Sequence, residues 1–416
     1  MKTKKNKIFI QIASYRDPEL INTLDSLIEN CSIPENLVIC IAHQYDDLHA
    51  IDKYRYDDRF KIIDIPFAES KGACWARNAI QQRYDGEEYT LQLDSHHRFA
   101  PNWDQELIGM IKQLKKKGHK KPLLTAYISS FNPENDPLER IHTPWRMDFD
   151  RFIPEGAVFF LPASIDDYQE RIEPVPSRFY SAHFCFTLGK FCLEVPHDPE
   201  YYFHGEEISI AVRAFTWGYD LFHPHKVVAW HEYTRRGRVK QWDDDKVWCS
   251  RNDKCHAKNR KLFGMDGETP ADDFGIYGFG KVRTLEDYER YAGVCFGKRA
   301  IQQYTLDHKY PPNPQYIDPK EYEESFLSIF KHCIDVGYDK VPEKDYDFWV
   351  VAFHDKNDNT VYRKDAEESE IQSYFNDPDG YCKVWREFQA AEKPAYWVVW
   401  PHSKSKGWGE RLTGGL

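Results

Sequence analysis

The amino-acid sequence predicts an α/β protein, in which a mixed, mainly parallel sheet is flanked by helices and followed by a small strand-rich domain. In the first part of the chain, short apolar strands alternate with segments whose apolar residues recur at helical spacing. That order is typical of a parallel sheet with helices on both faces. After the proline-rich segment 311–314, aromatic strands separated by turns replace this alternation. We therefore expect a catalytic or binding domain over residues 1–310 and an accessory domain over 311–416.

The first half of the expected sheet can be followed element by element. Strands are expected over residues 8–12, 37–42, 60–65 and 89–93. The first helix is expected to begin with Asp17 as its N-cap and Pro18 in its first turn, and the second to cover 73–83. A third helix is expected after Asn102, which would form a capping box with Gln105. Ligands of such sheets bind at the carboxyl ends of the strands.

The rest of the chain carries fewer signals of secondary structure. Residues 130–180 are rich in proline, aspartate and arginine, and we expect them to cross the surface as a long connection. A strand is expected over 178–187 and a helix within 201–217. In the C-terminal part a helix is expected over 326–337. Strands are expected there over 347–353 and 360–363, as a hairpin, and over 395–400.

Composition and charge narrow the class of protein. The 416 residues carry a formal net charge of −11 and have a pI of about 5.9, which disfavours a general nucleic-acid-binding protein. The ten cysteines are scattered and form no Cys-x-x-Cys pair, as in proteins of a reducing compartment. The apolar run near the N-terminus is too short for a signal peptide, and no run is long enough to span a membrane. We expect a cytoplasmic protein without an integral membrane segment.

Polar side chains gather where three of the expected strands end, at residues 14–16, 43–47 and 94–96. Asp94 and His96 offer one carboxylate oxygen and one imidazole nitrogen to a single divalent ion, a mixed set that suits manganese better than calcium. His231 ends a later strand and is a candidate third ligand. The alternative is a polar strand end with solvated histidines, because short motifs often match by chance.

Two further groups of residues have both a functional and an ordinary interpretation. Glu206 and Glu207 are candidate catalytic residues, but the helix dipole also favours carboxylates in the first turn of a helix. Arg77 could reach a bound phosphate or could be an ordinary arginine on a helix surface. Four basic residues that follow His231 are either a solvated charge run or a lid over an anionic diphosphate; they are Arg235, Arg236, Arg238 and Lys240.

Several stretches of the sequence resemble glycosyltransferase family 60. The matching stretches are residues 10–19, 72–78, 91–99, 203–209 and 282–285, in the order of that family. The resemblance implies a GT-A fold and transfer of N-acetylglucosamine from a UDP-sugar with retention of anomeric configuration. The Asp-x-His pair with a distant histidine is also similar to the polypeptide N-acetylgalactosaminyltransferases. Known relatives modify a hydroxyproline of a ubiquitin-ligase adaptor in the cytosol, which implies an acceptor hydroxyl on a protein or a glycan.

The resemblance implies catalytic roles for several of the candidate residues. Asp94, His96 and His231 would hold Mn²⁺ or Mg²⁺ against the diphosphate and absorb the charge that develops as UDP leaves, so Asp94 is also a candidate catalytic residue. Glu206 and Glu207 would lie at the junction of donor and acceptor.

Six residues would contact the UDP-sugar donor: Ser14, Arg16, Gln44, Asp46, Arg77 and Ser95. The first two follow the first strand and would face the nucleotide, and the next two follow the second strand and suit uridine. The helix arginine would reach the donor sugar or a phosphate, and the serine lies between two of the expected metal ligands.

Two other functions stay open at this point. A metal-dependent hydrolase could use the same aspartate and histidines to activate water. A non-catalytic glycan- or protein-binding module could use the 12 tryptophans and 26 tyrosines, and would bind no UDP. If the protein is a transferase, residues 311–416 are expected to select its acceptor, with Trp349 and Trp397 in the core of that domain and Trp408 exposed.

Overall fold

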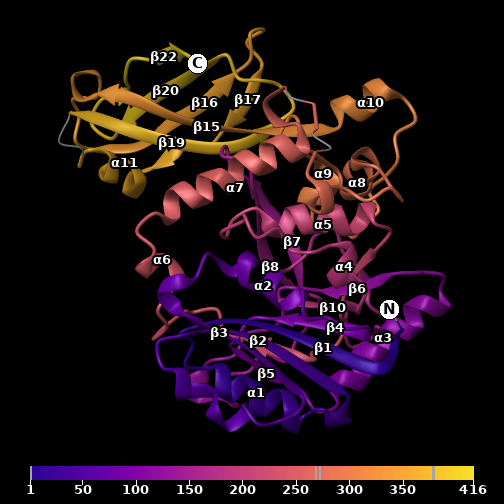
Figure 1. The fold of residues 1–416 in the computed structure, drawn as a ribbon. Helices are drawn as coiled ribbons and strands as arrows, with labels where there is room; N and C mark the ends of the chain where they lie inside the picture. The colour runs from indigo at the N-terminus through magenta and orange to yellow at the C-terminus, as the bar shows by residue number, and fades with distance from the viewer. Residues whose placement is uncertain (1, 268, 271–272, 377–379) are drawn as a thin grey trace. The chain divides into compact units, whose positions relative to one another are not determined.

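The computed structural model describes residues 2–267, 269–270, 273–376 and 380–416. The chain forms two compact units (Figure 1). The first unit contains Met1–Gly297 and Tyr304–Pro314, and the second contains Lys298–Gln303 and Gln315–Leu416. Each is described by itself below. Along the described residues, no helix combines the length and the apolar composition needed to cross a membrane.

An eight-stranded sheet forms the centre of the first unit, with the strand order β3-β2-β1-β4-β10-β6-β11-β9. Its first four strands are parallel; they are β1 (Lys4–Tyr15), β2 (Leu37–Tyr45), β3 (Phe60–Pro66) and β4 (Glu87–Leu93). The others are β6 (Pro122–Thr125), β9 (Val175–Pro176), β10 (Phe184–Leu188) and β11 (Asp220–His223). Strand β10 is antiparallel to both of its neighbours, so the sheet is mixed but mainly parallel, as the sequence predicts.

Helices cover both faces of this sheet because alternate residues of each strand point to opposite sides (Figure 1). Ile8, Ile10 and Ile12 of β1 pack toward α1 (Leu20–Glu29) and α3 (Trp103–Lys116). Phe9 packs on the other side, against residues of α2 (Ala73–Gln81). The remaining helices of this part of the chain are α4 (Phe191–Glu194), α5 (Glu206–Thr216), α6 (Gln241–Asp244), α7 (Trp248–Phe263), α8 (Leu285–Ala292) and α9 (Gln303–Leu306).

Two expected helix caps are wrong. Helix α1 begins at Leu20, with Glu19 as its N-cap. One carboxylate oxygen of Asp17 accepts a hydrogen bond from the backbone N–H of Glu19, and the other oxygen is hydrogen-bonded to Ser95 and His96, which follow β4. Asn102 does precede α3, but its backbone is left-handed and its side chain makes no capping hydrogen bond. Its amide oxygen accepts a hydrogen bond from the Ser32 hydroxyl instead.

Short strands outside the main sheet bring distant segments together. Strand β5 (His97–Phe99) pairs with β12 (Ala229–His231), which places His231 opposite His97. The expectation that residues 130–180 only cross the surface as a long connection is wrong. They contain a hairpin formed by β7 (Trp145–Phe152) and β8 (Val158–Ser164). Met147, Phe149 and Phe152 of β7 are buried and anchor the hairpin.

The second unit is built mainly of strands, as expected, but the helix expected over 326–337 is wrong. Those residues form β15 (Phe326–Gly337), which pairs along its length with β19 (Tyr381–Ala390). Ile334 and Val336 are buried at alternate positions, and a β-branched, alternating pattern suits a strand. The other strands are β14 (Ala300–Gln302), β16 (Tyr346–His354), β17 (Thr360–Arg363), β18 (Ala366–Glu367), β20 (Tyr396–Ser403), β21 (Gly407–Trp408) and β22 (Leu412–Gly415).

The hairpin of β16 and β17 and the strand β20 confirm the other expectations for this unit. Two short helices complete it, α10 (Pro319–Glu324) and α11 (Glu368–Tyr374). Trp349 is fully buried and Trp397 packs against the same apolar cluster. Trp408 is 48% exposed, as the sequence predicts. Strand β13 (Val294–Cys295) belongs to the first unit.

Candidate functional site

Asp94, His96 and His231 converge at one end of the main sheet. Asp94 follows the last residue of β4, and the pairing of β5 with β12 carries His231 to the same place. One ligand atom from each of the three side chains lies within 4.8 Å of the others. The Oδ2 atom of Asp94 is 3.7 Å from Nε2 of His96 and 3.6 Å from Nε2 of His231. Small adjustments would bring these atoms onto one divalent ion, as the sequence analysis proposes.

The chemistry of His231 fits a metal ligand. Its ring is 6% exposed, and neither ring nitrogen makes a hydrogen bond to the described residues. Burial lowers its pKa well below the ordinary histidine value, and the neighbouring His96 and His97 lower the pKa further, although the Asp94 carboxylate opposes the shift. The ring is therefore neutral, which is the form that coordinates metals.

A buried carboxylate orients His96. The Nδ1 atom of His96 is 2.7 Å from Oδ2 of Asp17, and the Ser95 hydroxyl donates to the same oxygen at 2.8 Å. Burial opposes the charge on Asp17, but the hydrogen bond to His96 and the charge of Arg238 bring its pKa below the ordinary value. Such a carboxylate fixes the ring and the tautomer of a metal-binding histidine, leaving the Nε2 lone pair free for the ion.

In this structure the guanidinium of Arg238 lies over the edge of the His96 ring. Its Nη1 atom is 2.5 Å from Nδ1 and 2.8 Å from Nε2 of His96. The same guanidinium pairs with Glu232 at 2.7 Å. Arg238 belongs to the basic segment that the sequence left open as a solvated charge run or a lid. Its ion pairs and ring contact show that this arginine, at least, is not a solvated charge.

Asp94 is ionised in this setting. Its pKa lies well below the ordinary value: burial raises it, but the interactions with the nearby His231 and His96 rings and with the guanidinium of Arg77 outweigh that effect. The Nη2 atom of Arg77 is 2.8 Å from Oδ1 of Asp94. Arg77 is itself buried on α2, so the alternative of an ordinary arginine on the helix surface is wrong.

Glu206 and Glu207 begin α5 beside this cluster. Gly205, the residue before them, has a φ of 92°, a left-handed conformation that turns the chain into the helix. Oε1 of Glu206 lies 3.8 Å from Nη1 of Arg77. Glu207 accepts hydrogen bonds from the Tyr127 hydroxyl at 2.8 Å and from the backbone N–H of Ala182 at 2.9 Å.

The two glutamates hold protons more tightly than ordinary glutamates. Burial raises the pKa of both, and the charge of Glu207 raises the pKa of Glu206 further, while Arg77 opposes the rise. The pKa of Glu206 is raised to about 8 and that of Glu207 to about 7. A buried carboxyl that keeps its proton near neutral pH is common at functional sites.

Two clefts meet at this cluster. The first, of about 160 Å³, is lined by Gln44, Asp94, Ser95, His96 and His231, by aromatic side chains that include Tyr202, Phe203 and Trp242, and by Arg235, Arg238 and Lys240. The second, of about 330 Å³, is lined by Arg77, Glu206, Glu207, Tyr127, His183 and residues of the β7–β8 hairpin. Asp94, Phe203, His231 and Arg235 line both clefts.

The other predicted donor contacts lie around the first cleft rather than in it. The side chain of Gln44 lines the cleft and its amide donates to the Ser14 carbonyl at 3.1 Å, so Ser14 supports Gln44 from behind. Arg16 pairs with Asp46 at 3.0 Å and with Asp244 of α6 at 2.8 Å. These three charged residues tie the ends of β1 and β2 to α6, which follows the basic segment.

Sequence reasoning missed several residues of the site. Asp17 was expected only as a helix cap, although its position just beyond the first strand end is a usable signal. Tyr202 and Trp242 line the first cleft, and Tyr127 reaches Glu207, but an isolated aromatic residue in a loop gives no sequence signal of its own.

Comparisons with known proteins agree with this architecture. The sequence matches the family described as Glycosyltransferase (GlcNAc) over residues 7–55 and 49–298. A search of curated protein sequences finds no match. The crystal structure of GalNAc-T7 with UDP, GalNAc and Mn²⁺ is similar, with 13% identity and a TM-score of 0.50 over 82% of this chain and 63% of that chain. This chain thus spans less than two thirds of that relative. The likeness confirms the GT-A fold expected from the sequence.

Another solved structure is similar at a lower TM-score. The crystal structure of S. aureus TarS shares 12% identity over 98% of this chain and 77% of that chain, with a TM-score of 0.36. A structure of S. aureus TarS in complex with UDP shares 11% identity over 62% of this chain and 72% of that chain, also with a TM-score of 0.36.

Proposed function

The chain belongs to the Glycosyltransferase (GlcNAc) family, and we propose that it is a metal-dependent enzyme that moves N-acetylglucosamine from UDP-N-acetylglucosamine to an acceptor hydroxyl, with retention. The acceptor would be a protein or a glycan. The observation that carries the proposal is the cluster of Asp94, His96 and His231 at the place where two clefts meet. One cleft would take the donor and the other the acceptor.

The proposed metal site is formed by residues whose protonation states already suit an ion. A bound Mn²⁺ or Mg²⁺ would neutralise diphosphate charge as UDP leaves. Asp94 supplies a carboxylate held in its ionised form, and His231 supplies a neutral ring without hydrogen bonds to the described residues. Asp17 keeps the Nε2 lone pair of His96 directed toward Asp94.

The polar lining of the first cleft suits a diphosphate, but its volume of about 160 Å³ requires the cleft to widen when a whole nucleotide binds. Gln44 offers an amide at the end of β2, and the Ser95 hydroxyl lies at the end of β4. Arg235, Arg238 and Lys240 also line the cleft and bring positive charge to it, which would offset the negative charge of a diphosphate. We propose that Arg238 leaves His96 and turns to the diphosphate when the donor binds.

Glu206 is proposed to act as a hydrogen-bond donor to the sugar or to the incoming hydroxyl. Its raised pKa keeps the carboxyl protonated near neutral pH, and a protonated carboxyl is a poor nucleophile and a poor base. Glu206 lines the second cleft, a short distance from Arg77, so it faces the position where donor and acceptor would meet. Glu207, held by Tyr127 and Ala182, would keep Glu206 in its protonated form.

We also propose that residues 311–416 form an accessory domain that selects the acceptor and takes no part in the chemistry. All the site residues named above belong to the first unit. The half-exposed Trp408 is the candidate contact with a partner. A Trp408→Ala variant should keep hydrolysis of the donor unchanged.

A direct test measures binding of UDP by calorimetry with and without MnCl₂, followed by a panel of nucleotide sugars scored by release of the nucleotide. We expect metal-dependent binding of UDP and slow hydrolysis of UDP-N-acetylglucosamine without acceptor. Binding that is equally tight in EDTA would contradict the metal site. Turnover of a GDP- or CMP-sugar but of no UDP-sugar would contradict the donor.

A further inference from the structure

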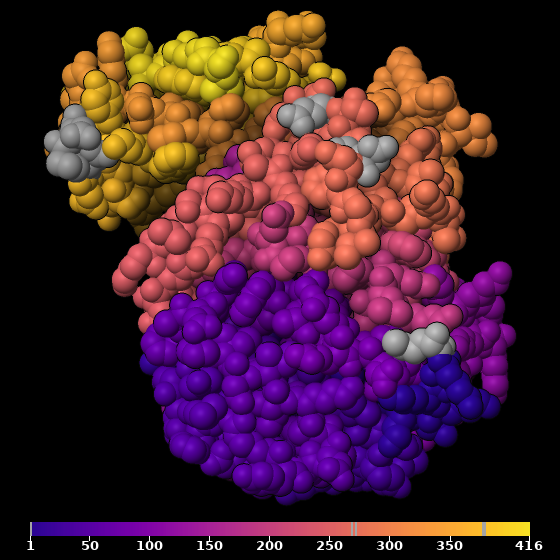
Figure 2. All heavy atoms as spheres, in the orientation of Figure 1, coloured from indigo at the N-terminus to yellow at the C-terminus, as the bar shows by residue number. Residues whose placement is uncertain are grey.

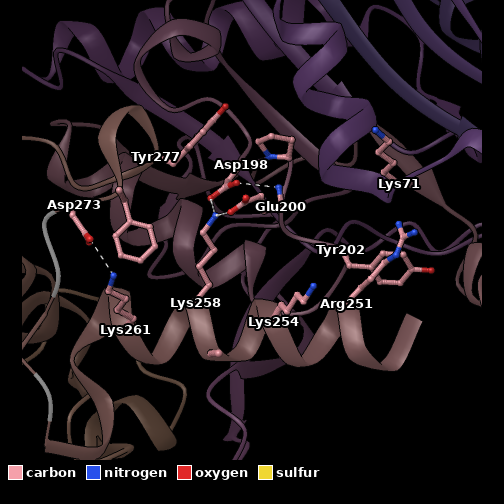
Figure 3. A pocket seen from close by; sticks show the side chains of 13 residues that line it. Lys71, Asp198, Glu200, Tyr202, Arg251, Lys254, Lys258, Lys261, Asp273 and Tyr277 are labelled. Carbon is pink, nitrogen blue, oxygen red and sulfur yellow. Dashed lines mark hydrogen bonds and ion pairs between the residues drawn. The ribbon is translucent and has the colours of Figure 1, made fainter. Parts of the chain in front are cut away.

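A third cleft lies beside the proposed donor cleft within the first unit (Figure 3). It has a volume of about 860 Å³, within the size range of ligand-binding sites. One wall is a face of α7, and the opposite wall includes Asp198, Glu200, Tyr277 and Lys71. Tyr202 lines both this cleft and the donor cleft, so the two are neighbours.

Cations line the α7 wall of this cleft, although the chain as a whole carries a net charge of −11. Arg251, Lys254, Lys258 and Lys261 are three or four residues apart and therefore share one face of the helix. In Figure 3 the lysine side chains rise from that face into the cleft, and Figure 2 shows the side chains of this part of the chain at the molecular surface.

Two of the cations that line the cleft lack a carboxylate partner. Lys258 pairs with Asp198 at 2.5 Å, and Lys261 pairs with Asp273 at 3.0 Å. Lys254 and Lys71 are exposed, and neither has a carboxylate within ion-pair distance among the described residues. The wall thus offers positive charge to a ligand from outside the chain.

A neighbouring face of α7 holds the loop that leads into Glu206. The backbone N–H of Tyr202 donates to Cys255 Sγ at 2.9 Å, and the backbone N–H of His204 donates to the Asn252 side chain at 3.1 Å. The Asn259 amide donates to the carbonyl of the glycine before Glu206 at 3.2 Å. A ligand on the basic face would therefore rest on the helix that positions the loop between the two clefts.

We propose that this cleft binds an acidic segment of the acceptor polypeptide, at a distance from the hydroxyl that is modified. The inference rests on the proposed function. Asp198, Glu200 and Asp273 also line the cleft, and they would repel a continuous phosphate backbone, so an acidic peptide with spaced carboxylates fits better than a nucleic acid.

The dimensions of the basic face match such a peptide. From Arg251 to Lys261 the helix rises by about 15 Å. In an extended peptide, side chains on one side recur every second residue, or about 7 Å. Three glutamates at alternate positions would therefore span the row of cations.

The test uses the full chain and a fluorescein-labelled decapeptide of five Glu-Ser repeats, with five Gln-Ser repeats as the neutral control. Fluorescence anisotropy should show binding of the acidic peptide only, weakening as salt is added. A double variant, Lys71→Glu with Lys254→Glu, should bind the peptide at least about tenfold more weakly. A matched variant on α3, Lys112→Glu with Lys116→Glu, has the same charge change and should bind it as the wild type does.

Hydrolysis of UDP-N-acetylglucosamine without acceptor reports on folding and should be unchanged in both double variants, because none of the four lysines lines the two proposed substrate clefts. Equal binding of both peptides, or equal weakening in both variants, would overturn the inference. Tighter binding of a ten-nucleotide oligothymidine, lost in the same cleft variant, would also overturn it. A wild type that hydrolyses no UDP-sugar would refute the proposed function instead, and the peptide titration would still decide whether the cleft binds acidic chains.

Discussion

The proposed metal-ligand cluster (Asp94, His96 and His231) and the glutamate pair (Glu206 and Glu207) adjoin each other, and they hold their carboxyl groups in opposite states. Asp94 is ionised, whereas Glu206 and Glu207 keep protons near neutral pH. Both regions contact the guanidinium of Arg77, at 2.8 Å from Asp94 and 3.8 Å from Glu206. The arginine alone therefore does not decide the charge of its neighbours.

The difference comes from the other partners of each carboxyl group. Asp94 has His96 and His231 close by, and their interactions with its charge outweigh the cost of burial. Glu206 has another carboxyl as its neighbour, and burial together with that repulsion raises its pKa. The N-terminus of α5 favours ionised glutamates, but its effect of about 0.3–1 kcal/mol is smaller than the effect of burial. This difference is what the two proposed roles require, since Asp94 would hold an ion and Glu206 would donate a hydrogen bond.

The largest effect is expected for Asp94→Asn, which removes the charged ligand and keeps the size of the side chain. Turnover of UDP-N-acetylglucosamine should fall at least about a thousandfold, because the ion that offsets diphosphate charge is no longer held. Metal-dependent binding of UDP should vanish in calorimetry. Thermal stability in EDTA serves as the control for folding. Wild-type affinity for UDP in manganese would place the metal elsewhere.

A smaller and selective effect is expected for Glu206. Replacement by alanine removes the proposed hydrogen-bond donor and should lower turnover about a hundredfold. Replacement by glutamine leaves a donor in place and should lower turnover by less than about tenfold. Both variants should bind UDP and manganese as the wild type does, in contrast to Asp94→Asn. If glutamine is as damaging as alanine, Glu206 acts as a base or a nucleophile, and the proposed contrast between the two regions is wrong.

Much of the fold followed from the sequence because β1 to β4 carry uninterrupted apolar patterns bounded by turn residues. Asp94 and His96 are two residues apart at the end of β4, so their proximity could be predicted without knowing the fold. The helix expected at 326–337 failed because its apolar residues fit both a helical and an alternating spacing. Pairing with β19 decided between them, and pairing over such a separation is not visible in one segment.

Only the site residues that lie at strand ends could be predicted from the sequence. His231 was found because it ends β12, but its approach to His96 depends on the pairing of β12 with β5. The burial of Arg77 and the proton held by Glu206 are properties of packing from several elements, which no local pattern encodes. Asp17 illustrates the same point, since its two oxygens serve a helix start and a histidine at once.

A more modest effect is expected for Asp17→Asn, which tests the support of the metal-ligand cluster. The change weakens the hold on the His96 ring and should reduce affinity for manganese about ten- to a hundredfold. The kcat at saturating manganese should be close to that of the wild type, because the oxygens of Asp17 are already engaged by Glu19, Ser95 and His96. Titration of turnover with MnCl₂ separates these two quantities. A loss of kcat that high manganese does not restore would show that Asp17 does more than orient His96.

The smallest effect concerns stability. The free energy of unfolding that each region contributes should change with pH in opposite directions. The folded-state pKa of Glu206, about 8, is above the ordinary value of 4.5, so its contribution to stability is present at low pH and is lost as the pH rises through 8. Asp94 has a lowered pKa, so its contribution is present above 3.8 and is lost as the pH falls.

In EDTA, the Tm of Glu206→Gln relative to the wild type should therefore rise by about 3 °C or more between pH 5 and pH 8.5. The deficit of Asp94→Asn should instead shrink only below pH 4. Calorimetric melting across this range measures both trends. Parallel trends for the two variants would mean that both carboxyl groups share one charge state.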